Sequence, residues 1–272
     1  MPPSYPDNGT GLWGKTTSTL DWCEENYAVT IYIAEFWNTI TNIAFVLPSV
    51  VALARASKDK LESRYVLSHF LLVLVGVGSW SFHGTLLYSM QMLDELPMLF
   101  SACCFLYCTW TCNVSPGRTT RFAKAVTFFY ALLTSCAYLR INEPLFHEAA
   151  YGFVVVLLVL HATYRARTIG CSARLYVVSI GGFAIGFFLW NLENQLCPSI
   201  RAMRDRLAWP LRPITQLHAL WHLFTGIAAY VHILLSYSMR MKFLGHPTKI
   251  VHLAGILPIL KPPTSWIETK EK

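Results

Sequence analysis

Long apolar runs alternate with short polar segments along most of this 272-residue chain. A helix needs about 20 predominantly apolar residues to cross the hydrocarbon core of a bilayer. Seven runs reach this length, and the segments between them are short. The pattern predicts an all-α integral membrane protein, folded as one seven-helix transmembrane bundle. The predicted spans are roughly residues 31–54, 65–87, 92–112, 122–141, 147–165, 174–196 and 214–238.

The rest of the chain divides around these spans. Residues 1–30 are polar and lack the basic start and apolar core of a cleavable signal peptide. Residues 239–272 are basic and contain prolines, so we expect an irregular tail. The predicted organisation is therefore an N-terminal segment (1–30), a transmembrane domain (31–238) and a tail (239–272).

The distribution of basic residues predicts the orientation of the bundle. Seven spans place the two ends of the chain on opposite sides of the membrane. Sixteen of the 22 Lys and Arg residues fall on the side of the C-terminal tail. The positive-inside rule then predicts a luminal N-terminus and a cytosolic C-terminus. Four arginines depart from this distribution on the predicted luminal side: Arg201, Arg204, Arg206 and Arg212.

Composition supports a membrane protein and argues against nucleic-acid binding. Charged residues make up 14% of the chain, hydrophobic residues 54%, and the formal net charge is +7. Soluble domains carry about 25% charged residues. Because the basic residues lie between apolar runs and in the tail, topology and lipid headgroups explain them better than nucleic acid does. We infer no obligate protein partner.

The cysteines give a further indication of which side is oxidising. Five of the eight fall within predicted spans, and Cys171 falls in a predicted cytosolic loop. Only Cys23 and Cys197 fall on the predicted luminal side, where disulfides form and persist. They are natural disulfide partners, and two free thiols are the alternative.

Polar side chains gather near the luminal ends of five predicted helices. A charged group inside lipid costs about 2.5–3.5 kcal/mol on insertion scales, so such groups indicate a functional site. Three pairs, Asn38/Asn42, Ser79/His83 and His218/His222, are four residues apart and therefore share a helix face. The residues are Glu35, Asn38 and Asn42; Ser79 and His83; Asp94 and Glu95; Asn191, Glu193 and Asn194; and His218 and His222.

Three histidines in this group predict a metal centre. His83, His218 and His222 could hold zinc with water in the fourth position, the arrangement typical of catalytic zinc. A pair of histidines four apart is a weak signal alone, since packing histidines or a haem pair give the same spacing. Ser79 and Asp94 nearby favour zinc, because neither helps to hold haem.

Oxygen donors crowd the N-terminal segment in the run LDWCEENY. Asp21, Glu24, Glu25 and Asn26 lie within six residues, and Glu35 follows at the first span. Oxygen ligands without imidazole or thiolate suit calcium. The spacing is not that of an EF-hand loop, and a solvated acidic turn is the alternative.

Seven runs of sequence together resemble the alkaline ceramidase family. They cover residues 18 to 222 in order, and the resemblance is greatest to the branch with fungal and phytoceramide-cleaving enzymes. The runs are STLDWCEENY, YIAEFWNT, GSWSFH, LLYSMQMLDELPM, NEPLFH, FLWNLEN and TQLHALWH. The resemblance implies a seven-span zinc hydrolase of the endoplasmic reticulum or Golgi. It implies calcium-activated cleavage of the ceramide amide bond to a sphingoid base and a fatty acid.

The resemblance also assigns roles to individual residues. It implies that His83, His218 and His222 are the zinc ligands, with Ser79 and Asp94 beside the zinc. The implied calcium ligands are Asp21, the main-chain carbonyl of Trp22, Glu24, Asn26 and Glu35, which leaves Glu25 out. It implies a luminal bridge between Cys23 and Cys197.

The expected chemistry is hydrolysis by an activated water. We expect Asp94 to act as general base and then general acid, and Ser79 to donate a hydrogen bond to the oxyanion. The chief alternative is a seven-span zinc receptor of the adiponectin and progestin receptor type. A bis-histidine haem protein and a plain scaffold or channel are further alternatives.

Overall fold

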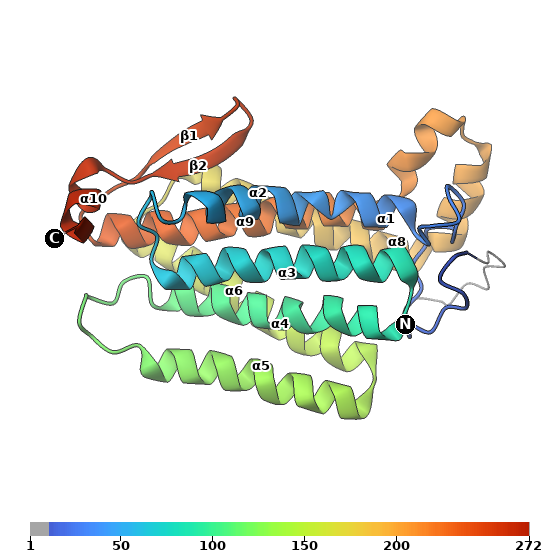
Figure 1. Cartoon of the computed structure of the whole chain (residues 1–272), viewed down its shortest axis with the longest axis horizontal. Coiled ribbons are helices and arrows are strands. Elements are labelled where there is room, and N and C mark those ends of the chain that lie inside the picture. Colours follow the sequence, from blue (N-terminus) through green and yellow to red (C-terminus); the bar gives the residue numbers. More distant parts are fainter. Residues whose placement is uncertain (1–10, 272) are drawn as a thin grey trace.

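The computed structural model describes residues 11–271, so residues 1–10 of the predicted N-terminal segment and Lys272 of the predicted tail lie outside the described residues. Within the described part, seven helical stretches are long and apolar enough to cross a membrane. Figure 1 shows the long helices lying side by side along the long axis of the molecule. The predicted all-α, seven-span architecture is confirmed, and its orientation in the membrane stays a prediction.

Most helix boundaries lie close to the predicted ones. The first span begins at Phe36 rather than residue 31 and is interrupted at Asn42, and the sixth continues to Arg206 rather than residue 196. The helices are α1 (Phe36–Thr41), α2 (Ile43–Arg55), α3 (Ser63–Thr85), α4 (Tyr88–Trp110), α5 (Arg121–Ile141), α6 (Pro144–Ile169), α7 (Ala173–Tyr176), the π-helix η1 (Val177–Gly181), α8 (Gly182–Arg206), the 3-10 helix η2 (Trp209–Thr215) and α9 (Leu217–Phe243).

The extra length of α8 explains two arginines that departed from the positive-inside pattern. The prediction from hydropathy placed the end of this span where the apolar run ends, but the helix continues through Pro198. Arg201 and Arg204 lie on the extension. Both donate hydrogen bonds to the main-chain carbonyl of Cys23, and Arg201 also donates to that of Glu24. Their guanidinium groups therefore hold the N-terminal segment against α8.

The expectation of an irregular tail was wrong. Strands β1 (Lys249–Leu253) and β2 (Leu257–Lys261) form an antiparallel hairpin, followed by α10 (Thr264–Glu271). Leu260 and Trp266 belong to the main hydrophobic core, and Tyr230 of α9 donates a hydrogen bond to the Pro258 carbonyl. The hairpin forms because its apolar residues cover α9, a tertiary contact that charge and proline content did not reveal. Figure 1 shows it over one end of the bundle.

Helices α3 and α4 approach each other most closely around Gly78. A Cβ atom at this position would lie 2.1 Å from the main-chain oxygen of Leu93 and 3.1 Å from the Asp94 Cα. Pro97 has no N–H to donate to the Leu93 carbonyl one turn earlier, so this carbonyl lacks its helical hydrogen bond. Glycine thus lets α3 lie directly against that part of α4, next to Ser79 and Asp94.

Candidate metal centre

The three predicted histidine ligands come together from two helices. His83 lies in the last turn of α3, and His218 and His222 lie at the start of α9. One ligand atom from each lies within 4.8 Å of the others, and all three side chains are buried. The spacing of four residues on α9 puts both of its histidines on the face that meets α3. The triad predicted from sequence is therefore a group that could hold one metal ion.

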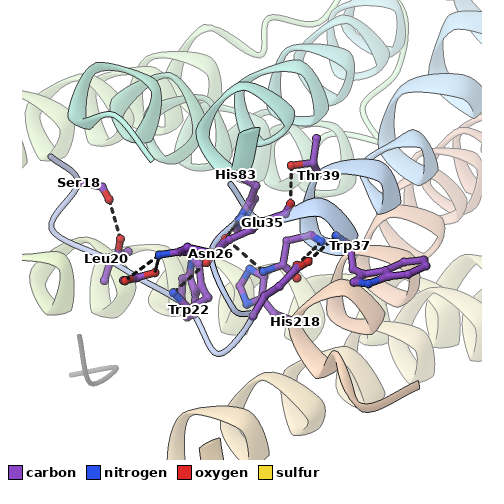
Figure 2. Close-up of polar contacts among 12 residues, drawn as sticks. Ser18, Leu20, Trp22, Asn26, Glu35, Trp37, Thr39, His83 and His218 are labelled. Atoms are coloured by element: carbon purple, nitrogen blue, oxygen red, sulfur yellow. Dashed lines mark hydrogen bonds and ion pairs between the residues drawn. The ribbon is translucent and has the colours of Figure 1, made fainter. Parts of the chain in front are cut away.

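Hydrogen bonds orient two of the three imidazoles. The Nδ1 atom of His83 lies 2.5 Å from Oε2 of Glu35, at the start of α1. The Nδ1 atom of His222 lies 3.0 Å from the main-chain oxygen of Asn38. Carboxylate and carbonyl oxygens only accept, so Nδ1 carries the hydrogen in each ring and Nε2 keeps its lone pair for a metal. Figure 2 shows Glu35 and His83 pointing toward each other.

The third imidazole is held by its main chain and by stacking. The N–H of His218 donates to Oε2 of Glu193 at 2.5 Å, and the ring stacks on Trp22 with centroids 4.0 Å apart. Its buried Nδ1 atom has no hydrogen-bond partner among the described residues. A buried polar atom left unpaired is costly. Three neutral imidazoles, two oriented through Nδ1 and one with an unpaired nitrogen, fit a metal such as zinc.

Ser79 and Asp94 lie together, as the sequence predicts. The Ser79 hydroxyl donates a hydrogen bond to the Asp94 carboxylate, and both side chains are buried. Ser79 precedes His83 by one helical turn on α3, so the pair and the histidine share one helix face. The close approach at Gly78 brings Asp94 of α4 to this face. The arrangement places a carboxylate and a hydroxyl group on the face of α3 that carries His83.

The predicted calcium ligands lie close together in the chain, and several of them hydrogen-bond to one another. Both carboxylate oxygens of Glu24 accept main-chain N–H groups at the start of α1, at 2.7 and 2.8 Å. The Asp21 carboxylate accepts from the amide of Asn26. Oε1 of Glu35 accepts the Trp22 N–H at 3.1 Å. Across residues 11–271, the histidine triad is the one group of three or more such side chains with ligand atoms this close.

Burial perturbs the ionisation of Glu24 in this segment. Burial, followed by the charge of nearby Glu35, raises the pKa of Glu24 to about 8. Two buried carboxylates near each other repel when both are ionised, and a cation between them would relieve this cost. Figure 2 shows Trp22 and Asn26 of this segment beside Glu35.

A disulfide and an ion pair fix the N-terminal segment to α8. Cys23 and Cys197 are joined, with Cα atoms 5.6 Å apart. Arg204 forms an ion pair of 2.6 Å with Glu25. This contact gives Glu25, the acidic residue that the resemblance leaves out of the calcium set, a different partner.

Sequence reasoning gave no role to Glu193, which the structure places at the centre of the site. Oε1 accepts the Cys23 N–H at 3.2 Å while Oε2 accepts the His218 N–H. The sequence could have indicated a role for Glu193, because a carboxylate within an apolar span is rare and usually functional. Neighbouring Asn191, which we expected in the same pocket, instead donates to the Phe187 carbonyl of its own helix.

Comparison with known proteins agrees with this geometry. Residues 14–256 match the family model described as Ceramidase. The chain is 43% identical to alkaline ceramidase 3 of Mus musculus over 91% of this chain and 93% of that protein. It is 35% identical to alkaline ceramidase YPC1 of Saccharomyces cerevisiae, over 85% and 79% of the two chains. It is 28% identical to an alkaline ceramidase of Arabidopsis thaliana, over 94% and 96%.

Within the branch of fungal and phytoceramide-cleaving enzymes that the sequence runs suggested, these identities do not single out the fungal members, because the mouse protein is more similar than the yeast protein. The match covers residues 14–30 of the N-terminal segment, the triad and all seven spans. The chain therefore belongs to the alkaline ceramidase family.

Proposed function

We propose that this protein is a zinc-dependent, calcium-activated ceramidase that hydrolyses the amide bond of ceramide within the membrane. The observation that carries the proposal is the buried triad of His83, His218 and His222, beside Ser79 and Asp94, in a chain of the ceramidase family. The products would be a sphingoid base and a free fatty acid. The family and its relatives imply ceramide as the substrate class, and endoplasmic reticulum or Golgi membranes are the compartment we propose.

Each residue of the site would have its own role in the hydrolysis. Zinc, held by the three histidines, would lower the pKa of a water molecule to about 7 and polarise the amide carbonyl. Asp94 would take a proton from the attacking water and deliver it to the departing amine. Ser79, whose hydroxyl now meets Asp94, would donate to the oxyanion that forms on the amide carbonyl. Comparable oxyanion donors contribute about 2.7–4 kcal/mol.

The surroundings of the site suit a lipid substrate. A second hydrophobic cluster of Leu20, Trp22, Ala34, Phe82 and Leu86 is packed around the triad end of α3. It shields the site from water while the helices face lipid on their outer surfaces. A substrate with two hydrocarbon chains could therefore stay in an apolar environment while its amide reaches the polar residues.

Calcium would act on the N-terminal segment. We propose Asp21, the Trp22 carbonyl, Glu24, Asn26 and Glu35 as its ligands. The support is the clustering of these oxygens in one segment, the raised pKa of Glu24 and the anchoring of the segment to α8. Glu35 contacts both Trp22 and His83, so ordering of this segment would pass directly to a zinc ligand.

The test is lipid mass spectrometry of purified protein incubated with a mixture of ceramides, with and without calcium. Wild type should release sphingoid base, and His218→Ala should release none. His161→Ala is the matched control, because His161 lies in α6 and its Nδ1 contacts the Leu157 carbonyl, away from the triad. A wild-type protein that binds zinc but releases no base would support the receptor alternative instead.

A further inference from the structure

A polar cavity lies at the end of the bundle opposite the histidine triad. Its volume is about 260 Å³, and it lies where α3 begins and where α4 and α9 end. Figure 1 shows this end beside the segment that joins α4 to α5. The lining includes the arginines Arg64, Arg118 and Arg240 and the hydroxyl-bearing Tyr107, Thr111 and Thr120.

The charge of this cavity is positive. Glu62 is its one acidic lining residue in the described chain. Oε1 of Glu62 accepts from Arg240 at 3.0 Å, and Oε2 accepts from Arg64. Burial acts to raise the pKa of Glu62, but the adjacent Arg64 and Arg240 hold it below its ordinary value. Three arginines against one ionised carboxylate leave two positive charges in excess.

Hydrogen-bond donors remain available in the cavity. Arg240 is only 6% exposed, and its Nε and Nη1 groups bind Glu62 and the carbonyls of Cys112 and Val114. None of these hydrogen bonds uses its Nη2 group. The Arg118 guanidinium is exposed and takes part in no hydrogen bond or ion pair within residues 11–271. The cavity thus pairs a fixed, buried guanidinium with a free one.

We propose that this cavity binds the phosphate group of an anionic ligand. Guanidinium groups match the geometry of phosphate oxygens and form short charge-assisted hydrogen bonds with them. Hydroxyl groups from Tyr107 and Thr120, which bond each other at 2.8 Å, can complete the set of donors. The phosphate could belong to a phospholipid headgroup, as in basic pockets between membrane helices, or to a soluble phosphate.

The experiment titrates detergent-purified, full-length protein with a short-chain phosphatidylinositol phosphate and, separately, with inorganic phosphate, followed by native mass spectrometry. Arg118→Gln should weaken binding about tenfold, since it removes a charge-assisted donor. This variant should fold normally, because the side chain is exposed and unbonded. Arg121→Gln is the matched control, since Arg121 is exposed at the start of α5 but does not line the cavity.

Each outcome bears on the proposal. Binding of both probes, weakened by Arg118→Gln and not by Arg121→Gln, supports a phosphate site. Binding of the lipid alone identifies a headgroup as the source, and binding of inorganic phosphate alone identifies a soluble one. No binding to wild type, or equal weakening by both variants, overturns the proposal. Ceramide hydrolysis is not measured, so the result is independent of the proposed function.

Discussion

At the scale of single residues, carboxylate and carbonyl groups that are not themselves predicted zinc ligands orient the imidazole rings of the triad. Glu35 and the Asn38 carbonyl each face the Nδ1 atom of one histidine, which leaves Nε2 for a metal. Such partners typically change metal affinity or activity 10- to 100-fold when they are removed. Glu35 also accepts a hydrogen bond from Trp22 of the N-terminal segment, so the two predicted metal sites share this side chain.

Glu193 should be a positioning residue for His218. Glu193→Ala should lower zinc content and thermal stability, because two buried N–H groups lose a charged acceptor, each such hydrogen bond contributing about 1.5–3 kcal/mol. Glu193→Gln should recover part of both, since its amide oxygen can still accept one N–H. Elemental analysis and thermal unfolding are the measurements. Asn191→Ala should change neither; loss of zinc in that control, or none in Glu193→Ala, would contradict the assignment.

Substitutions at Asp21 and Glu35 should distinguish the predicted calcium site from the predicted zinc site. Asp21→Asn should abolish stimulation of hydrolysis by calcium but keep zinc, because the Asp21 carboxylate accepts hydrogen bonds from Asn26 of its own segment. Glu35→Ala should lose calcium stimulation and also weaken zinc binding, since it contacts His83. Calcium titrations of ceramide hydrolysis and elemental analysis test both. Full calcium stimulation in Glu35→Ala would show that the coupling does not exist.

At the scale of helices, the close approach of α3 and α4 at Gly78 brings Ser79 and Asp94 together. Gly78→Ala should destabilise the protein by about 1–3 kcal/mol, because the new Cβ would meet a main-chain oxygen that cannot move aside. Hydrolysis should fall as well, since Ser79 and Asp94 would be forced apart. Gly152→Ala is the control, because nothing lies within 4 Å of its Cβ position. Equal thermal stability of the two variants would show that the crossing tolerates a wider spacing.

At the scale of the whole molecule, the bundle has two chemically different ends. The triad, the disulfide and the N-terminal segment occupy one end, and the arginine-lined cavity and the hairpin occupy the other. The first end should face the lumen and the second the cytosol, because basic residues predominate near the second.

Glycosylation can test the orientation. The chain carries an acceptor sequence, Asn8-Gly9-Thr10, in the N-terminal segment. We expect a glycan on Asn8 when the protein is made in eukaryotic cells, seen as an endoglycosidase-sensitive mass that Asn8→Gln removes. An acceptor sequence added after Lys272 should stay unmodified. Modification there, with none at Asn8, would mean that the bundle is inverted.

The disulfide provides a second test of the same polarity. Cys23 and Cys197 should resist alkylation until a reductant is added, whereas Cys171 should be alkylated once the protein is unfolded without reductant. Mass mapping of the peptides measures this. Alkylation of both Cys23 and Cys197 without reductant would mean that they are free thiols in the mature protein.

The apolar runs alone determined the class of fold, because each span needs about 20 apolar residues whatever its neighbours are. The spacing of four between His218 and His222 likewise determined that they share a face. Motif resemblance then named the ligands. These features are local, so the sequence carries them directly.

Contacts between distant segments needed the tertiary structure. Glu193 meets Cys23 and His218, Arg201 and Arg204 reach the N-terminal segment, and the hairpin covers α9. In each case a polar or apolar group is satisfied by a partner far away along the chain. Local hydropathy cannot specify such a partner, because many residues could satisfy the same donor, and only packing of the helices selects one.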